Sequence, residues 1–304
     1  MSASNPAADR VGLRPVGRDR TVARATRIGL RTIVLVYLLL ILALPVLMIF
    51  WRTFEGGIEP VIKAIQRPAF QSAFWLTVTI TAIAVPVNTV FGIVTALAIV
   101  RRRFPGRGLL NALIDLPFAL SPVIIGLALI LVYGKHGWFG GILGDLGITV
   151  IFAVPGMILA TLFVSLPFVV REVIPVLREI GTDQEEAAYT LGASHWRTFW
   201  RVTLPAIRWG VIYGVILTTA RSLGEYGAVA VVSGKIAGKT ETLTTHVEER
   251  YLAFDLAGAY TASITLALMA LLVLLGMQAY QAGRFRRRHR DDAPMTTIQI
   301  GDIR

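Results

Sequence analysis

The hydrophobic positions of the chain form long runs separated by polar segments. The runs cover residues 32–51, 73–100, 109–133, 150–170, 209–232 and 257–280. Each run has about the twenty residues that an α-helix needs to cross the hydrocarbon core of a bilayer. Prolines interrupt several of the runs, among them Pro86, Pro117, Pro122 and Pro155. Membrane helices tolerate such prolines because neighbouring groups re-satisfy the freed backbone. The pattern predicts an all-α, polytopic membrane protein with six transmembrane helices.

Basic residues are concentrated in alternate polar segments. Arginines cluster between the second and third runs, between the fourth and fifth, and after the sixth, while the other connecting segments carry mixed or acidic charge. Cytoplasmic segments of membrane proteins carry an excess of Lys and Arg. The alternation therefore places both termini in the cytoplasm, and an even number of spans agrees with termini on the same side.

Composition agrees with this assignment. Of 304 residues, 55% are hydrophobic and 16% charged, which is too apolar for an ordinary soluble domain. The net charge of +11 does not indicate a nucleic-acid partner, because the arginines flank apolar runs that would contact membrane lipid. Cysteine is absent, the four histidines are scattered, and no set of residues suggests catalysis. We expect a protein that is not an enzyme and binds no metal.

The two ends of the chain differ from its centre. Residues 1–28 are basic without apolar periodicity and predict a disordered cytoplasmic tail. Residues 29–283 would form the six-helix domain, and residues 284–304 a cytoplasmic C-terminal tail. Residues 54–72 and 233–256 could each form a short helix outside the bilayer.

One polar segment, residues 182–205, has the sequence TDQEEAAYTLGASHWRTFWRVTLP and predicts two short helices outside the bilayer. Thr182 with Glu185 three residues later is a capping-box pattern. Gly192 suits the left-handed conformation that ends a helix. Ser194 can cap a second, aromatic-rich helix, which we expect to end near Pro205.

The spacing of this segment resembles the EAA signature of ABC-importer permeases. Glu186-Ala187-Ala188 is followed after three residues by Gly192 and, after nine more, by a Val-Thr-Leu-Pro sequence where the family has Ile at the first position. The resemblance implies a type I ABC importer permease fold in the bacterial plasma (inner) membrane. It also implies that residues 178–206 form the cytoplasmic loop that contacts a separate ATPase subunit. The residues assigned to this contact are Glu185, Glu186, Ala187, Ala188, Gly192, Leu204 and Pro205.

Two charges lie inside the fifth apolar run. Arg221 and Glu225 are four residues apart and would share one helical face. Charges at that depth are costly, so they either pair to lock helix packing or line a translocation pathway in which Arg221 meets an anion. Asp115, in the third run, is an alternative partner and a further pathway candidate. Gly210 and Gly214 have the GxxxG spacing of closely packed helices.

Residues 220–234, ARSLGEYGAVAVVSG, sharpen the resemblance. A similar (S/A)LGE(F/Y)GA run occurs in the sulfate/thiosulfate and molybdate branch, and the continuation looks most like the W-type sulfate permease subunit. This implies a permease subunit of a sulfate/thiosulfate importer. Its partners would be a second permease subunit of the T type, two ATP-binding subunits and an extracytoplasmic sulfate-binding protein. This chain itself would carry no cofactor, since ATP would be bound by the partner subunits.

Other interpretations remain. Residues 233–240 nearly match a phosphate-binding P-loop, but Ser233 replaces its first Gly and no strand precedes it. A molybdate or tungstate importer fits the same motifs. An ion-gradient-driven secondary transporter should show inverted repeats, and neither it nor a structural scaffold accounts for the EAA spacing. The residues alone leave open which anion is carried, and whether the two permease subunits are identical.

Overall fold

The structure is a computed structural model that describes residues 19–291, which form helices joined by turns. Its contacts divide the chain into two units, residues 1–52 and 53–304. In the first unit, α1 (Asp19–Leu38), the π-helical segment Leu39–Ala43 and the start of α2 (Leu44–Phe54) form one continuous helix.

Helix α1 overlaps the end of the segment that we predicted to be a disordered tail, residues 1–28. The helix begins at Asp19 rather than beyond residue 28. Extending an existing helix costs far less free energy than nucleating one, so the polar residues 19–28 continue the apolar helix that follows. Residues 1–18, and residues 292–304 of the predicted C-terminal tail, lie outside the described residues.

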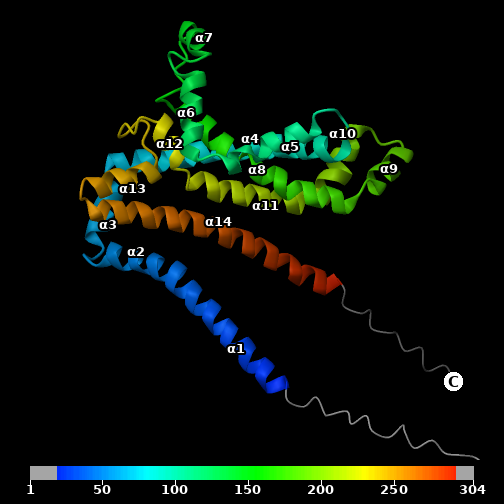
Figure 1. The fold of residues 1–304 in the computed structure, drawn as a ribbon, viewed down its shortest axis with the longest axis horizontal. Coiled ribbons are helices and arrows are strands. Elements are labelled where there is room, and N and C mark those ends of the chain that lie inside the picture. The colour runs from blue at the N-terminus through cyan, green and yellow to red at the C-terminus, as the bar shows by residue number, and fades with distance from the viewer. Residues whose placement is uncertain (1–18, 292–304) are drawn as a thin grey trace, which may run out of the picture. The chain divides into compact units, whose positions relative to one another are not determined.

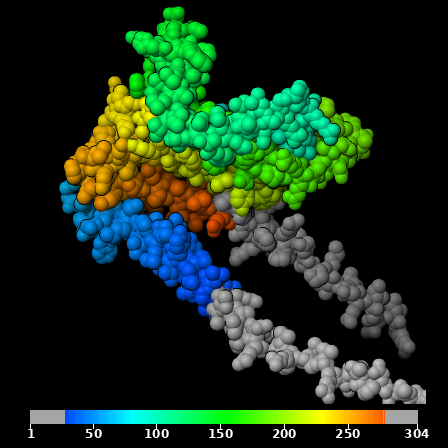
Figure 2. All heavy atoms as spheres, in the orientation of Figure 1, coloured from blue at the N-terminus to red at the C-terminus, as the bar shows by residue number. Residues whose placement is uncertain are grey.

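The second unit contains the remaining helices. They are α3 (Glu59–Gln66), α4 (Pro68–Arg101), α5 (Arg107–Ala119), α6 (Pro122–Tyr133), α7 (Gly140–Asp145), α8 (Val154–Ile180), α9 (Asp183–Thr190), α10 (His195–Thr198), the π-helical segment Phe199–Thr203, α11 (Leu204–Leu223), α12 (Gly227–Val232), α13 (Leu243–Leu252) and α14 (Leu256–Asp291). Helices α4, α8 and α11 pack side by side, and α14 contacts α11 and α13 (Figure 1). Helices α6 and α7 stand out from this packed body (Figure 2).

The described helices support the prediction of six spans. Five are long and apolar enough to cross a membrane, and α5 with α6 makes a sixth if this bent pair is one span. The third run is not one straight helix, because the chain bends by 115° between α5 and α6. Pro122 disfavours the helical conformation of the preceding residue, and Ser121 accordingly has an extended backbone with ψ of 137°.

The fifth span differs from its predicted bounds of 209–232 at both ends. The helix begins at His195 and continues past Pro205, where we expected it to stop. A π-helical turn precedes this proline, with the Leu204 N–H donating to the Phe199 carbonyl, and proline is tolerated in the first turn of a new helical register. The helix ends at Leu223, and α12 starts separately after it.

Glycines bring α8 and α11 into close contact. A Cβ added to Gly214 would lie 2.7 Å from the Cα atom of Val169, and one added to Gly210 would lie 2.7 Å from the carbonyl oxygen of Glu172. No side chain larger than hydrogen fits at either position, which confirms the packing role predicted from the GxxxG spacing. The packing brings the C-terminal end of α8 close to the start of α11, and the chain between them forms the candidate site.

Candidate functional site

The α8–α11 loop (residues 181–203) lies at one end of the packed helices, and α12 and α13 lie at the other (Figure 1). Two predictions about this loop are confirmed. Gly192 ends the turn after α9 with a φ of +82°, and the Ser194 hydroxyl accepts the Arg197 N–H at 3.4 Å at the start of α10. The loop is thus a short helix, a glycine turn and a second helix that runs on into α11.

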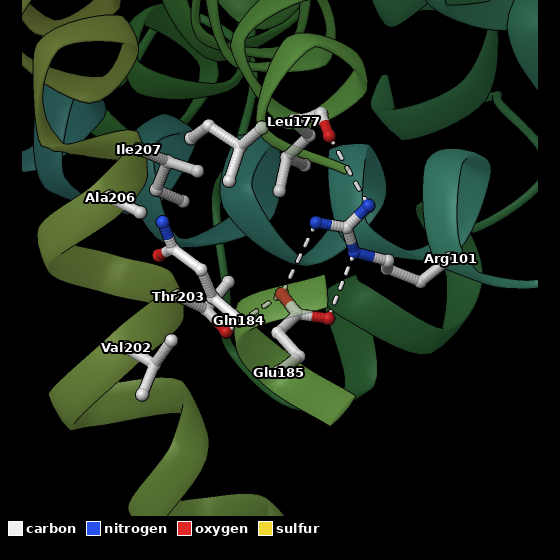
Figure 3. A pocket seen from close by; sticks show the side chains of 9 residues that line it. Arg101, Leu177, Gln184, Glu185, Val202, Thr203, Ala206 and Ile207 are labelled. Atoms are coloured by element: carbon white, nitrogen blue, oxygen red, sulfur yellow. Dashed lines mark hydrogen bonds and ion pairs between the residues drawn. The ribbon is translucent and has the colours of Figure 1, made fainter. Parts of the chain in front are cut away.

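The predicted capping box is wrong. Thr182 makes no side-chain cap, and its hydroxyl donates instead to the Glu186 carboxylate at 2.7 Å. Glu185 does not turn back to the start of its own helix. Its carboxylate points into the protein, where an arginine and a threonine from other helices bind it (Figure 3).

Arg101, the last residue of α4, is the main partner of Glu185. Its Nε atom lies 3.0 Å from Oε2 of the carboxylate, and its Nη2 atom donates to Oε1 at 3.2 Å. The Thr203 hydroxyl also donates to Oε1, at 2.9 Å. The charged side chains are only 15% and 14% exposed, so water screens their attraction weakly.

The same guanidinium also caps α8. Arg101 donates to the carbonyl oxygens of Leu177 and Gly181 at 3.2 and 2.6 Å. The last carbonyls of a helix have no partner within it and form the negative end of its dipole, where a cation is favourable. We call Arg101, Glu185 and Thr203, with these two carbonyls, the Arg101 cluster. It joins α4, the end of α8, α9 and the π-helical segment before α11.

Four large apolar side chains of the loop are exposed. Leu191 is 88% exposed, Trp196 71%, Trp200 51% and Tyr189 40%. The Trp196 ring packs edge-on against Trp200, with centroids 5.6 Å apart. We call these four exposed residues, three of which are aromatic, the aromatic face. Exposed apolar patches of this kind mark surfaces that bind another molecule.

The structure separates the residues assigned to the ATPase contact into two groups. Glu186, Ala187 and Pro205 are exposed, and the Gly192 turn has open space around it. Ala188 is half-buried. Glu185 and Leu204 face inward: Glu185 belongs to the Arg101 cluster, and Leu204 packs against the core between α4, α8 and α11.

The Arg221–Glu225 pair forms, but not on one helical face. Glu225 lies beyond the end of α11, and its Oε2 atom is 2.5 Å from the Nη1 atom of Arg221. Its other oxygen accepts the Ala228 N–H at 2.9 Å and so caps α12. A small hydroxyl-rich hollow lies beside this pair, lined in part by Thr77, Thr161, Ser222, Thr242 and Thr244.

Asp115 does not pair with Arg221 as proposed from the sequence. It binds Arg171 of α8 with both carboxylate oxygens, one of them at 2.7 Å from Nε. The reason is the fold: α5 packs against α8, which brings these two residues together.

A second buried charge lies in the α12–α14 segment (residues 233–255), and sequence reasoning missed it. The Glu241 side chain is fully buried, and its Oε1 atom is 2.7 Å from the Nδ1 atom of His246, whose side chain is 2% exposed. Burial opposes ionisation of Glu241, but hydrogen bonds from His246 and Glu249 lower its pKa overall. The pKa of Glu249 is raised, mainly by burial and also by the hydrogen bond and the negative charge of Glu241.

The near-P-loop has another role in this segment. The Lys235 ammonium binds the Glu248 carboxylate at 2.5 Å. The hydrogen bond between them raises the pKa of Lys235 and lowers that of Glu248. No strand precedes these residues in the described chain, so the context of a phosphate loop is absent there. Within residues 19–291, no three His, Asp or Glu side chains are grouped to hold a metal ion.

Comparison with known proteins identifies related sequences. Residues 88–287 match the family model described as "Binding-protein-dependent transport system inner membrane component". The "Sulfate transport system permease protein CysW" of Synechocystis sp. (strain ATCC 27184 / PCC 6803 / Kazusa) is 54% identical over 241 residues, covering 79% of this chain and 87% of that protein. The protein of the same name from Escherichia coli (strain K12) is 47% identical over 247 residues, covering 81% and 84%.

A more distant relative and a solved structure extend the comparison. The "Probable sulfate transport system permease protein cysT" of Chlorokybus atmophyticus is 37% identical over 246 residues, covering 81% of this chain and 86% of that protein. The crystal structure of a bacterial alginate ABC transporter bound to its periplasmic protein contains a chain with a TM-score of 0.70 at 18% identity, covering 86% of this chain and 95% of that one. At this identity the likeness establishes the fold alone.

Proposed function

The chain belongs to the family of binding-protein-dependent transport system inner membrane components, and from this membership we propose that it is a transmembrane permease subunit of an ATP-driven sulfate/thiosulfate importer. It forms part of the translocation pathway in the inner membrane, with both termini in the cytoplasm. It hydrolyses no ATP itself. Two ATP-binding subunits on separate chains supply the energy.

The aromatic face is the observation that carries this proposal. Its four residues are exposed, and they belong to the loop that has the EAA spacing, which lies at one end of the packed spans (Figure 1). Large aromatic side chains at the centre of an interface supply most of its binding free energy. We assign the aromatic face, with exposed Glu186, Ala187 and Gly192, to contact with an ATP-binding subunit. The small alanine side chains allow close approach, and Gly192 sets the turn.

The relatives support the substrate and the subunit type. Curated proteins of the CysW type are 47–54% identical to the chain, whereas the cysT protein is 37% identical. We therefore assign this chain the W-type position. A T-type chain would be its partner permease, and an extracytoplasmic sulfate-binding protein would deliver the anion.

The pathway assignment rests on the Arg221–Glu225 pair. The hydroxyl of Ser222, which lines the hollow beside the pair, is buried without a hydrogen-bond partner. Hydroxyl and guanidinium donors suit a tetrahedral oxyanion. We place the anion's route past Arg221, with Glu225 as the group that occupies the guanidinium when no anion is present. Asp115 is a weaker candidate, because Arg171 neutralises it.

The test is uptake of radiolabelled sulfate by cells that lack this chain, before and after its gene is restored. Sulfate uptake should depend on the chain and be inhibited by excess thiosulfate but not by molybdate. Unchanged sulfate uptake with lost molybdate uptake would assign the chain to a molybdate or tungstate importer. Uptake that persists when the ATP-binding subunits are deleted but collapses with the ion gradient would indicate a secondary transporter.

A further inference from the structure

Glu185 does not behave as a docking residue. It adjoins the EAA signature, but its side chain is 14% exposed and both of its oxygens are bound inside the protein. A carboxylate so placed has little surface to offer an ATP-binding subunit. Its partners are Arg101, which lies 84 positions earlier in the chain, and Thr203, which lies 18 positions later. The cluster therefore connects parts of the fold that the chain itself does not join locally.

The need for such a connection follows from the local backbone. Helix α9 has eight residues and is preceded by Gly181 with a φ of +69° and followed by Gly192 with a φ of +82°. So short a helix is marginal by itself, and glycine permits a wide range of backbone conformations on each side of it. Without a further attachment, a force on α9 would bend these two turns.

The Arg101 cluster supplies the attachment. The planar guanidinium binds the α9 carboxylate and the Leu177 carbonyl at the same time (Figure 3). It also donates to the Gly181 carbonyl. A lysine ammonium has the charge but lacks the planar fork that reaches these acceptors together. The Thr203 hydroxyl extends the connection to the helix that continues into α11.

We propose that the Arg101 cluster is the rigid connection that passes displacement of α9 to α4, α8 and α11, with Glu185 as a positioning residue rather than a contact to the ATP-binding subunit. This inference rests on the proposed function, in which α9 is moved by that subunit. It assigns separate roles to adjacent residues: Glu186 faces the partner, and Glu185 holds the helix that carries it.

The test uses the complete transporter reconstituted in vesicles, with ATP hydrolysis and sulfate uptake measured on the same sample. Glu185→Gln removes the charge and one acceptor while keeping the shape. We expect sulfate transported per ATP hydrolysed to fall about tenfold, within the range typical of coupling between two sites, while ATP hydrolysis continues. Arg101→Lys should have a similar effect, and Thr203→Val a smaller one.

Two controls match these changes. Asp183→Asn removes the same charge from an exposed position in the same turn of α9, and Arg102→Gln alters the exposed arginine next to Arg101. Both should transport normally. Because this chain has no cysteine, Thr190→Cys gives it a single labelling position, at the end of α9, and the chain is labelled before it is combined with its partners. The label should become more mobile with Glu185→Gln but not with Asp183→Asn.

Uptake per ATP and label mobility that are the same in Glu185→Gln and Asp183→Asn would overturn the proposal. If Glu185→Gln does not assemble, a second variant tests the connection. In this variant Arg101→Cys and Glu185→Cys are combined, and a short bifunctional thiol reagent joins the two cysteines. Restored uptake supports a mechanical connection, and unrestored uptake refutes it. Absence of ATP-dependent sulfate uptake by the unaltered complex would refute the proposed function instead, and label mobility would still test the cluster.

Discussion

Glu185, which is mostly buried, and Glu241, which is fully buried, are carboxylates at opposite ends of the packed helices. Each belongs to or adjoins a short helix. Glu185 binds Arg101, which lies 84 positions away, and so ties α9 to three other helices. Glu241 binds His246, five positions away, and so ties the turn before α13 to that same helix. The Arg101–Glu185 pair therefore connects separate helices, whereas the Glu241–His246 pair stabilises one local segment.

Substitutions around Glu185 and around Glu241 should therefore have different effects. At the Glu185 end, substitutions should impair transport while the spans stay folded. At the Glu241 end, they should reduce stability first, because an unpaired buried charge costs free energy wherever it lies.

The largest effect is expected from Gly192→Asp in the α8–α11 loop. Gly192 has a φ of +82°, which L side chains rarely adopt, and the new charge would lie on the surface assigned to the ATP-binding subunit. Sulfate uptake should fall to the level of cells lacking the chain, while ATP hydrolysis continues and membrane abundance stays normal. Gly57→Asp is the control, since Gly57 has a φ of +84° and equally open space. Normal uptake by Gly192→Asp would contradict the assigned role of the loop.

Next in size is the effect of Glu241→Leu on stability. The substitution leaves His246 buried without its partner, and breaking a buried pair in this way costs about 3 kcal/mol. A lower midpoint of thermal unfolding in detergent should reveal the loss, with transport per ATP unchanged in the protein that remains folded. If Glu241→Leu left the unfolding midpoint unchanged but lowered transport per ATP, the proposed difference between the Glu185 end and the Glu241 end would be wrong.

Trp196→Ala should weaken binding of the ATP-binding subunit without unfolding the permease. Trp196 is 71% exposed, so its removal costs little within this chain. A central aromatic residue contributes roughly 2 kcal/mol to an interface, or about 30-fold in affinity. A binding titration with the purified ATP-binding subunit measures this loss. Trp138→Ala, at 86% exposure outside the loop, is the matched control and should bind normally.

The smallest effect is the pH-dependent gain from Glu249→Gln. The pKa of Glu249 is raised by burial and by Glu241, so the folded protein loses stability as pH rises from the unfolded value of about 4.3 towards the raised folded value. The substitution should thus stabilise the protein above that window and leave it unchanged below. The gain should stay under about 1 kcal/mol, because the side chain is 40% exposed and solvent screens it. Thermal unfolding midpoints at several pH values would show whether the gain disappears in acid.

The sequence predicted the features that local patterns encode. Apolar runs located the spans, and Gly192 and Ser194 located the turn and the second helix start of the α8–α11 loop. The bend between α5 and α6 also had a local signal in Pro122, because proline constrains the residue before it. The apolar run continues through this proline, so the hydrophobic pattern alone shows no break there.

The Arg101 cluster could not be predicted in the same way. Arg101 is the first of several arginines that follow the second apolar run. An excess of arginines is expected in any cytoplasmic segment of a membrane protein, so the charge pattern gives no reason to expect a specific partner for Arg101. Glu185 fits a capping box, which a distant guanidinium overrides. The pairing depends on α4 and α8 ending at the same level, a property of tertiary packing. The partners of Asp115 and Glu241 were missed for the same reason.

The unbroken helix from His195 to Leu223 has a geometric consequence. From His195 to Arg221 it is roughly 39 Å long at 1.5 Å per residue. A stiff rod of that length pivoting near its His195 end moves Arg221 by about 0.7 Å for each degree of tilt. A tilt of a few degrees would thus shift the guanidinium by more than the tolerance of a hydrogen bond. If the predicted docking loop tilts this helix, the length of the helix sets how far Arg221 moves for a given tilt.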